Sequence, residues 1–168
     1  MIKAGVYADE LKKMDLDMLI SSARLHDVGK ITISDVILNK PEKLTDEEFE
    51  IMKSHAAEGE RIIEQIISRT DDVEFLRNAK LFAGYHHERW DGKGYPSGLK
   101  GADIPLHGRI MAIADAYDAL VSERPYKPVL SYERAAEIIN EDSGICFDPE
   151  LVKIFVDCEK AFKKAAVE

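Results

Sequence analysis

The sequence predicts an all-α fold, a bundle of about seven or eight helices. Apolar residues recur at three- and four-residue intervals along most of the 168 positions, which is the spacing of one face of a helix. Three of these segments follow residues that favour helix N-termini, namely Thr45, Ser131 and Asp148. Segments that alternate as a strand does are nearly absent, and neither an internal repeat nor a linker interrupts the chain. A single domain over residues 1–168 is therefore expected.

The N-terminal quarter predicts one firm helix between two weaker segments. Residues 6–14 carry a weak amphipathic pattern. The stronger apolar spacing over 16–25 predicts a helix that Gly29 ends. Residues 31–39 are short and mixed in character, and Pro41 stops any helix there.

Three helical segments are expected in the middle of the chain. A capping-box pattern at 45–48 predicts a helix that starts near Asp46. Gly59 is expected to interrupt it, because glycine is a poor helix former. The isoleucine-rich stripe over 62–67 then forms a separate segment, and 75–85 forms a further helix.

A loop separates these helices from three more. Residues 91–101 hold four of the chain's ten glycines, which is loop chemistry. A long apolar helix is expected from Pro105 to Leu120, ended by Arg124-Pro125. Residues 132–141 form the next helix, and Asp148-Pro149 starts the last one with an N-cap and a first-turn proline.

Charge and hydropathy exclude several classes of function. The net charge is −9, from 32 acidic and 23 basic residues, whereas a nucleic-acid polymer would require a basic face. No apolar run approaches the roughly 20 residues of a membrane helix, and the longest candidate, 110–121, is broken by two aspartates. The N-terminus has no apolar signal region. We therefore expect a soluble cytoplasmic protein with no membrane partner.

The first two of the five histidines, His26 and His55, are weak candidates for metal ligands when each is considered alone. His26-Asp27 closes an apolar helix and offers an imidazole nitrogen beside a carboxylate that can bridge two cations. Taken alone, a capped helix end with a polar histidine explains this pair equally well. His55 alone is more typical of a histidine on a helix surface.

The pair His86-His87 is a stronger signal, because two adjacent imidazoles at a helix end have little structural purpose. They suit two metals a few ångströms apart, although this pair alone does not decide the matter. Asp115 lies in an otherwise apolar helix, where an unpaired buried carboxylate is costly. A metal, a salt bridge or a hydrogen bond between helices would each remove that cost. Asp118, one turn on, is better explained by hydrogen bonding or capping.

Taken in order, these motifs closely resemble the HD-GYP family, a branch of the HD metallophosphohydrolase superfamily. The similarity runs from about Tyr7 to Phe155, which is most of the chain. It is carried by the following segments: His26-Asp27-Val28-Gly29-Lys30, His55, His86-His87-Glu88-Arg89-Trp90-Asp91-Gly92-Lys93-Gly94-Tyr95-Pro96, Gly98-Leu99-Lys100-Gly101, Ile104-Pro105, Asp115-Ala116-Tyr117-Asp118-Ala119-Leu120, Arg124-Pro125-Tyr126-Lys127 and Phe147-Asp148-Pro149.

The resemblance implies a helical bundle of the HD-domain type and a bacterial signalling enzyme. Such an enzyme is a metal-dependent phosphodiesterase that hydrolyses cyclic di-GMP to linear pGpG, to GMP, or to both. The implied cofactors are two divalent metals, iron or manganese, and a third metal is not expected here. The residues that match the family's metal ligands are His26, Asp27, His55, His86, His87 and Asp115. Asp27 would bridge the two metals.

The resemblance also implies which residues meet the substrate. Lys30 would face the scissile phosphate and act with Asp27 in catalysis, while Arg124 and Lys127 would grip phosphates or guanine. Tyr95 belongs to the family's namesake loop, Gly94-Tyr95-Pro96, which would border the site and contact diguanylate cyclase (GGDEF) domains. The resemblance leaves a homodimer open.

One departure from the superfamily pattern concerns the N-terminus. Related sites also use a histidine well before the HD pair, and no histidine precedes His26 here. We therefore expect residues 1–168 to lack part of the N-terminal helix region. One metal would then keep only His26, Asp27, Asp115 and water unless Glu10 or Asp9 substituted for the missing histidine, and catalysis would be compromised.

Two other functions compete with the phosphodiesterase reading. One is a catalytically weak module that senses the nucleotide or docks a signalling partner. The other is an HD hydrolase that acts on another cyclic dinucleotide or on a nucleotide.

Overall fold

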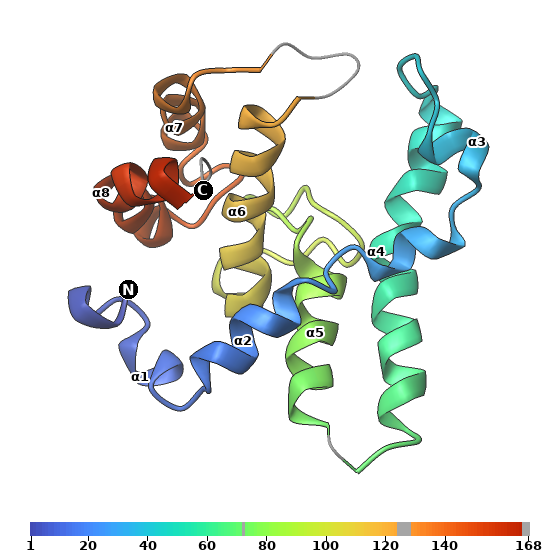
Figure 1. Cartoon of the computed structure of the whole chain (residues 1–168), viewed down its shortest axis with the longest axis horizontal. Helices are drawn as coiled ribbons and strands as arrows, with labels where there is room; N and C mark the ends of the chain where they lie inside the picture. The colour runs from blue at the N-terminus through green and yellow to red at the C-terminus, as the bar shows by residue number, and fades with distance from the viewer. Residues whose placement is uncertain (72, 124–128, 166–168) are drawn as a thin grey trace.

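The computed structural model describes residues 1–71, 73–123 and 129–165, and over these residues the chain is helical without a strand (Figure 1). The all-α prediction is confirmed. The α-helices of the described part are α1 (Ala8–Leu11), α2 (Leu16–Ala23), α3 (Asp35–Leu38), α4 (Asp46–Ile67), α5 (Glu74–Tyr85), α6 (Leu106–Val121), α7 (Tyr132–Glu141) and α8 (Pro149–Ala165). Short 3-10 helices lie between them: η1 (Ile2–Ala4), η2 (Val28–Thr32) and η3 (Gly101–Asp103).

The caps predicted from the sequence are present. Thr45 forms the full capping box of α4, because its hydroxyl accepts from the Glu48 backbone N–H while the Glu48 carboxylate accepts from that of Thr45. Ser131 accepts from a backbone N–H in the first turn of α7. Asp148 Oδ1 accepts from the Glu150 backbone N–H, 2.9 Å away, at the start of α8. These hydrogen bonds satisfy donors that a helix N-terminus leaves unpaired.

Two glycines do not end helices as the sequence predicts. Gly59 lies inside α4, which continues without a break from Asp46 to Ile67. Gly29 lies inside η2 rather than at the end of α2. A Cβ on Gly59 would lie 3.2 Å from the Ala83 Cβ and 3.3 Å from the Gly29 backbone nitrogen. Close packing at these glycines therefore outweighs the helix propensity, a difference of about 1 kcal/mol between glycine and alanine.

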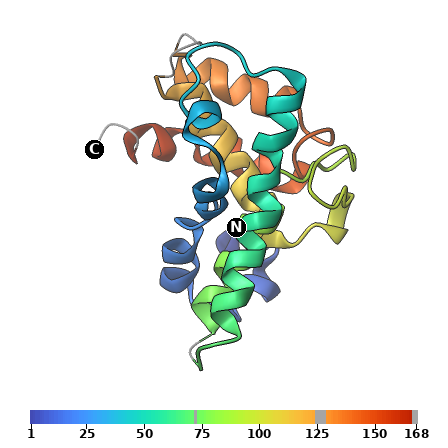
Figure 2. The same ribbon diagram turned by 90° about the vertical axis from the view of Figure 1, so that its right-hand side faces the viewer.

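Helix α5 is the centre of the bundle. It packs against α2, α4 and α6, and it runs antiparallel to α4, to which a short connection joins it (Figure 1). Helix α6 packs in turn against α7 and α8. The segment between α5 and α6, residues 86–105, projects from one side of the bundle (Figure 2). Arg124-Pro125, which we expected to end α6, lies outside the described residues, and α6 itself ends at Val121.

The apolar core is divided into two clusters. The larger one joins buried side chains of α6, α7 and α8, among them Ile113, Ile139 and Val152. The smaller one lies between α4 and α5 around Ile63. Burial of apolar area in both clusters holds the helices that carry the candidate site residues. Among the described residues, no helix has the length and apolar composition needed to cross a membrane.

A buried ion pair fixes the start of α6 against α8. Arg109 Nη1 donates to Asp148 Oδ2 at 2.8 Å, and the Tyr7 hydroxyl donates to the same oxygen at 2.7 Å. Arg109 Nε also donates to the Ile104 carbonyl, so the guanidinium is satisfied on two sides. Burial, with the Asp148 carboxylate second, raises the pKa of Tyr7 to about 12. This network ties the N-terminal segment to the helix that carries Asp115, and motif spacing did not predict it.

Candidate metal centre

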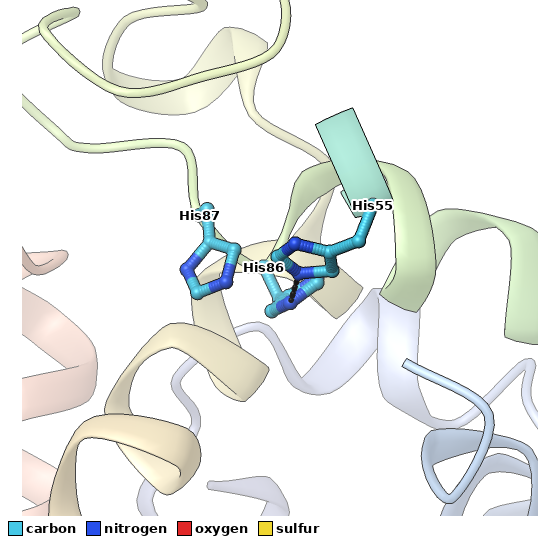
Figure 3. Close-up of side chains that lie close together, drawn as sticks. All are labelled: His55, His86 and His87. Atoms are coloured by element: carbon cyan, nitrogen blue, oxygen red, sulfur yellow. Dashed lines mark hydrogen bonds between the residues drawn. The ribbon is translucent and has the colours of Figure 1, made fainter. Parts of the chain in front are cut away.

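Four separate segments bring their histidines and aspartates to one place. His26 and Asp27 lie in the turn after α2, His55 lies on α4, and His86 and His87 directly follow α5. The rings of His55, His86 and His87 point towards one another (Figure 3), and one donor atom of each lies within 4.8 Å of the others. The Nε2 atoms of His55 and His86 are 3.3 Å apart.

The Asp27 carboxylate lies between two sets of imidazoles. Its Oδ2 is 3.4 Å from His26 Nε2, while its Oδ1 is 3.4 Å from His55 Nε2 and 3.8 Å from His86 Nε2. The two oxygens of one side chain therefore face different histidines. This is the arrangement that a carboxylate shared by two cations requires.

Asp115 completes the group from α6. It lines a cavity of about 240 Å³ together with His86 and His87. Its charge also acts on His26 and His55, where it favours the protonated forms. The structure thus brings all six predicted metal-ligating residues to one region, and their roles as ligands remain a prediction.

Backbone carbonyls orient three of the imidazoles. The Nδ1 atoms of His26 and His55 lie 2.9 and 2.6 Å from the carbonyl oxygens of Ala23 and Met52, and His86 Nδ1 lies 3.0 Å from two carbonyls of α5. A carbonyl can only accept, so each Nδ1 carries the proton and donates it. In the neutral ring the Nε2 lone pair then points into the cluster. Such outer hydrogen bonds are typical of metal-binding histidines.

The donor set fits a divalent cation. With both Nδ1 atoms protonated, the Nε2 lone pairs of His55 and His86 face each other at 3.3 Å, which is repulsive unless a cation lies between them. Two nitrogens that bind one ion at about 2.1 Å lie about 3.0 Å apart at a right angle and about 3.4 Å apart at the tetrahedral angle. Both imidazoles are almost fully buried, His55 1% and His86 2% exposed. Imidazole nitrogens with carboxylate oxygens suit iron, manganese or zinc.

Burial sets most of the proton affinities at the cluster. Burial, then the neighbouring imidazoles, lowers the pKa of His86 to about 4 and that of His87 to about 2. Burial also lowers the pKa of His55. These three rings are consequently neutral at pH 7, the state in which imidazole ligates a metal.

At His26 and Asp27, in contrast, hydrogen bonds outweigh burial in setting the pKa values. Burial alone would lower the pKa of His26, but the Asp27 hydrogen bond and the Ala23 carbonyl outweigh it and raise that pKa. Burial alone would raise the pKa of Asp27, but hydrogen bonds from His26 and Lys30 hold it well below its usual range. Asp27 is therefore an anion at any physiological pH.

The metal-free protein should lose stability as the pH falls from 6.5 to 5. In this window a histidine of the unfolded chain, with a pKa of about 6.5, takes up a proton, whereas folded His86, with a pKa of about 4, stays neutral. His55 and His87 act in the same direction and His26 opposes them, so the unfolded state binds more protons overall. For each additional proton that the unfolded state binds, the free energy of unfolding falls by about 1.4 kcal/mol per unit decrease in pH. Urea unfolding in EDTA at three pH values measures this slope.

A matched variant isolates one of these histidines. His86→Asn should reduce the slope of the free energy of unfolding against pH by the amount that corresponds to about one proton. The variant has no imidazole at this position that takes up a proton only in the unfolded state. Asp27 titrates at lower pH and does not contribute within this window. A free energy of unfolding that is flat, or that rises towards pH 5, would contradict the neutral, buried imidazoles.

Two glycines allow the segments of the cluster to approach. A Cβ on Gly29, two residues after Asp27, would lie 1.9 Å from the His55 carbonyl oxygen. A Cβ on Gly108 in α6 would lie 2.6 Å from the carbonyl oxygen of Tyr85, the residue before His86. Since Cβ atoms cannot approach a backbone so closely, only glycine permits these contacts. The distances between Asp27, His55 and His86 depend on them.

The predicted substrate-binding residues have different outcomes. Lys30 lies beside the cluster, with its Nζ 2.5 Å from Asp27 Oδ2. Tyr95 lines the same cavity as Asp115, and its ring lies 4.7 Å from that of His87, centroid to centroid. Arg124 and Lys127 lie outside the described residues, and their roles stay predictions.

The structure also shows the surroundings of the other residues considered in the sequence. The interpretation of His55 as a surface histidine is wrong, because the ring is buried against His86. Asp118 is exposed and accepts from the Ser122 hydroxyl, as its hydrogen-bonding interpretation expected. Asp9 and Glu10 lie exposed on α1.

The structure also adds residues that motif reasoning did not single out. Glu88 is 3% exposed, and its carboxylate accepts from the backbone N–H groups of Ser97, Gly98 and Leu99. Arg89 lines the cavity and holds Asp91 through a two-point ion pair. The signal for Glu88 was its place directly after two histidines, but its partners are nine to eleven residues away in a glycine-rich loop. Spacing alone did not indicate that contact.

Comparison with known proteins shows the family of the chain. A family model of the HD domain matches residues 4–151. A cyclic di-GMP phosphodiesterase of Vibrio cholerae serotype O1 is 48% identical over 156 residues, which is 93% of this chain and 32% of that protein. A cyclic di-GMP phosphodiesterase of Thermotoga maritima is 50% identical over 139 residues, which is 83% of this chain and 36% of that protein.

A third relative is named for a different dinucleotide. The 3'3'-cGAMP-specific phosphodiesterase 2 of Vibrio cholerae is 42% identical over 147 residues, 88% of this chain and 27% of that protein. The chain spans about a third of the length of these curated relatives. The relatives named for cyclic di-GMP agree with the HD-GYP resemblance seen in the motifs. Because the family model covers most of the chain, from the first helices to the start of α8, the chain belongs to the HD domain family.

Proposed function

We propose that this chain is a metal-dependent phosphodiesterase domain that hydrolyses cyclic di-GMP to linear pGpG, to GMP, or to both. The observation that carries the proposal is the Asp27 carboxylate, whose two oxygens face His26 on one side and His55 with His86 on the other. The names of relatives at 48% and 50% identity support the substrate. The cavity beside the cluster supports a site for it.

The six clustered residues would hold two cations, iron or manganese. His55, His86 and His87 would serve one ion, His26 and Asp115 the other, and Asp27 both. Such ions supply Lewis acidity to a phosphoryl group and make water a nucleophile at neutral pH. No serine or cysteine nucleophile is then required.

The chain's own cations would hold the substrate. With a net charge of −9, the protein must supply positive charge locally if it is to bind a phosphodiester anion. Lys30 would do so, and the proposal is supported by its position at the edge of the cluster beside Asp27 and by a side chain that is 38% exposed. Tyr95 would form the cavity wall, and Arg124 and Lys127 would grip phosphate or guanine. These roles follow the family positions.

Hydrolysis of 3'3'-cGAMP is a second candidate. The observation that favours it is the relative at 42% identity that is named for this substrate. Both molecules are cyclic dinucleotides with two phosphodiester bonds, so the same cluster would serve either one. The difference lies in a single base.

Turnover measurements test the proposal. Purified protein with added Mn²⁺ or Fe²⁺ should convert cyclic di-GMP to pGpG or GMP, and EDTA should stop the reaction. 3'3'-cGAMP is assayed in parallel to rank the substrates. His107→Gln is a matched control, because this buried histidine pairs with Asn78 outside the cluster and should leave turnover unchanged. His55→Gln should abolish it.

Two results would contradict catalysis in different ways. Metal and cyclic di-GMP bound without product would support the catalytically weak sensing or docking module instead. Metal content at background level, measured by ICP-MS, would reject the metal site itself.

Three further expectations stay predictions from the sequence. They are docking of GGDEF domains on Gly94-Tyr95-Pro96, a homodimer and a cytoplasmic location.

A further inference from the structure

His87 is held differently from the other three imidazoles of the cluster. The rings of His26, His55 and His86 are each tied to a backbone carbonyl through Nδ1. Within the described part of the chain, the His87 ring has no such hydrogen bond. Rings surround it instead: His86 lies at 4.0 Å, Tyr95 at 4.7 Å and His55 at 5.0 Å between centroids.

Tyr95 is the neighbour of His87 that is not itself a candidate ligand. Its ring is tilted by 32° to the imidazole, with the centroids 4.7 Å apart. Aromatic rings at this separation attract each other, and their contact restricts rotation about the side-chain bonds. The Tyr95 backbone N–H also donates to the His87 carbonyl at 3.2 Å, so the two residues are joined twice.

Glu88 holds Tyr95 in this position. Its buried carboxylate accepts the backbone N–H groups of Ser97 at 2.7 Å, Gly98 at 3.1 Å and Leu99 at 2.9 Å. Three hydrogen bonds to one ionised group fold the loop after Tyr95 back onto the residue after His87. A carboxylate is suited to this task because it only accepts, and all three partners are donors.

We propose that Tyr95 and Glu88 are positioning residues for His87, Tyr95 by packing its ring against the imidazole and Glu88 by anchoring the loop that carries Tyr95. The inference rests on the proposed role of His87 as a metal ligand. Tyr95 would then fix the orientation of the His87 ring, as backbone carbonyls fix the rings of the other three histidines. Loss of such contacts around a metal ligand lowers metal affinity about 10- to 100-fold.

Two readouts on the full chain test the proposal. In metal-free protein, NMR of the His87 ring protons reports the neighbouring Tyr95 ring through its ring current. In Co²⁺ titrations, visible absorption reports affinity and ligand geometry. Tyr95→Leu should shift the His87 resonances and weaken Co²⁺ binding about 10-fold, with an altered spectrum. Tyr95→Phe keeps the ring and should match the wild type in both.

Glu88→Gln should produce changes in the same direction as Tyr95→Leu, because the amide nitrogen replaces one of the two accepting oxygens and sets a donor against at least one of the three backbone N–H groups. The double variant should lose no more affinity than either single one, since both act through one contact. Matched controls are Tyr132→Leu on α7 and Glu58→Gln, which pairs with Arg61 on the surface of α4. Circular dichroism checks that each variant is folded.

The outcomes separate this proposal from the proposed function. If Glu88→Gln or Tyr95→Leu leaves the His87 resonances in place, the positioning role is wrong. Tyr95 contacts the substrate rather than positioning His87 if two results are found together. These are a raised KM for cyclic di-GMP in Tyr95→Phe and an unchanged Co²⁺ affinity in Tyr95→Leu. If the wild type binds no Co²⁺, the proposed metal function fails, and the NMR comparison still decides whether Tyr95 and Glu88 orient the ring.

Discussion

Replacing Asp27 with alanine is expected to remove most of the bound metal and to weaken Mn²⁺ affinity at least about 100-fold, because outer-shell changes alone cost 10- to 100-fold. One oxygen of Asp27 faces His26 and the other faces His55 and His86, so a single truncation affects both proposed ions. The loss also removes the negative charge that pairs with Lys30. ICP-MS after dialysis and Mn²⁺ titration measure the effect.

Two further variants sharpen this experiment. Asp27→Asn keeps the volume and removes the charge, so it should lose metal while the fold is retained. Asp157→Ala, an exposed aspartate on α8, is the matched control and should bind metal as the wild type does. Wild-type metal content in Asp27→Ala would show that the carboxylate does not bridge the site.

Gly29→Ala should lower the free energy of unfolding by about 3 kcal/mol or more, at the upper end of overpacking effects. The new Cβ would lie 1.9 Å from the His55 carbonyl oxygen and 2.5 Å from the Gly59 backbone nitrogen. Neither atom can rotate away, so η2 must move off α4. Asp27 precedes η2 and would move with it, and metal affinity should therefore fall as well. Urea unfolding and Mn²⁺ titration measure the two effects.

Gly84→Ala is the control for a helical glycine near the same histidines. Its Cβ would lie 3.0 Å from Glu60 Oε2, the end of a side chain that can rotate, and 3.3 Å from Glu60 Cβ, which a shift of a few tenths of an ångström relieves. Alanine is favoured over glycine in a helix by about 1 kcal/mol, which offsets this contact, so the variant should be much less destabilised than Gly29→Ala. Equal stability of Gly29→Ala and the wild type would show that η2 is not held against α4 by this contact.

Local features of the sequence were enough for the fold class. Helical periodicity and the caps at Thr45, Ser131 and Asp148 depend on neighbours within one turn, so they can be recognised without tertiary information. The same local reasoning failed at Gly59, where α4 continues. The contacts of Gly59 with Gly29 and Ala83 come from other segments, and no local pattern contains them.

The order of the motifs likewise named the candidate ligands and the family, since residue type and spacing along the chain carry that information. Tertiary structure decided how these residues face one another. The burial of His55, the two-sided position of Asp27 and the inward Nε2 atoms depend on packing among α2, α4 and α5. The Glu88 contacts depend on how a glycine-rich loop folds back. The distances among Asp27, His55 and His86 join segments that are far apart in sequence, and only the packed chain determines them.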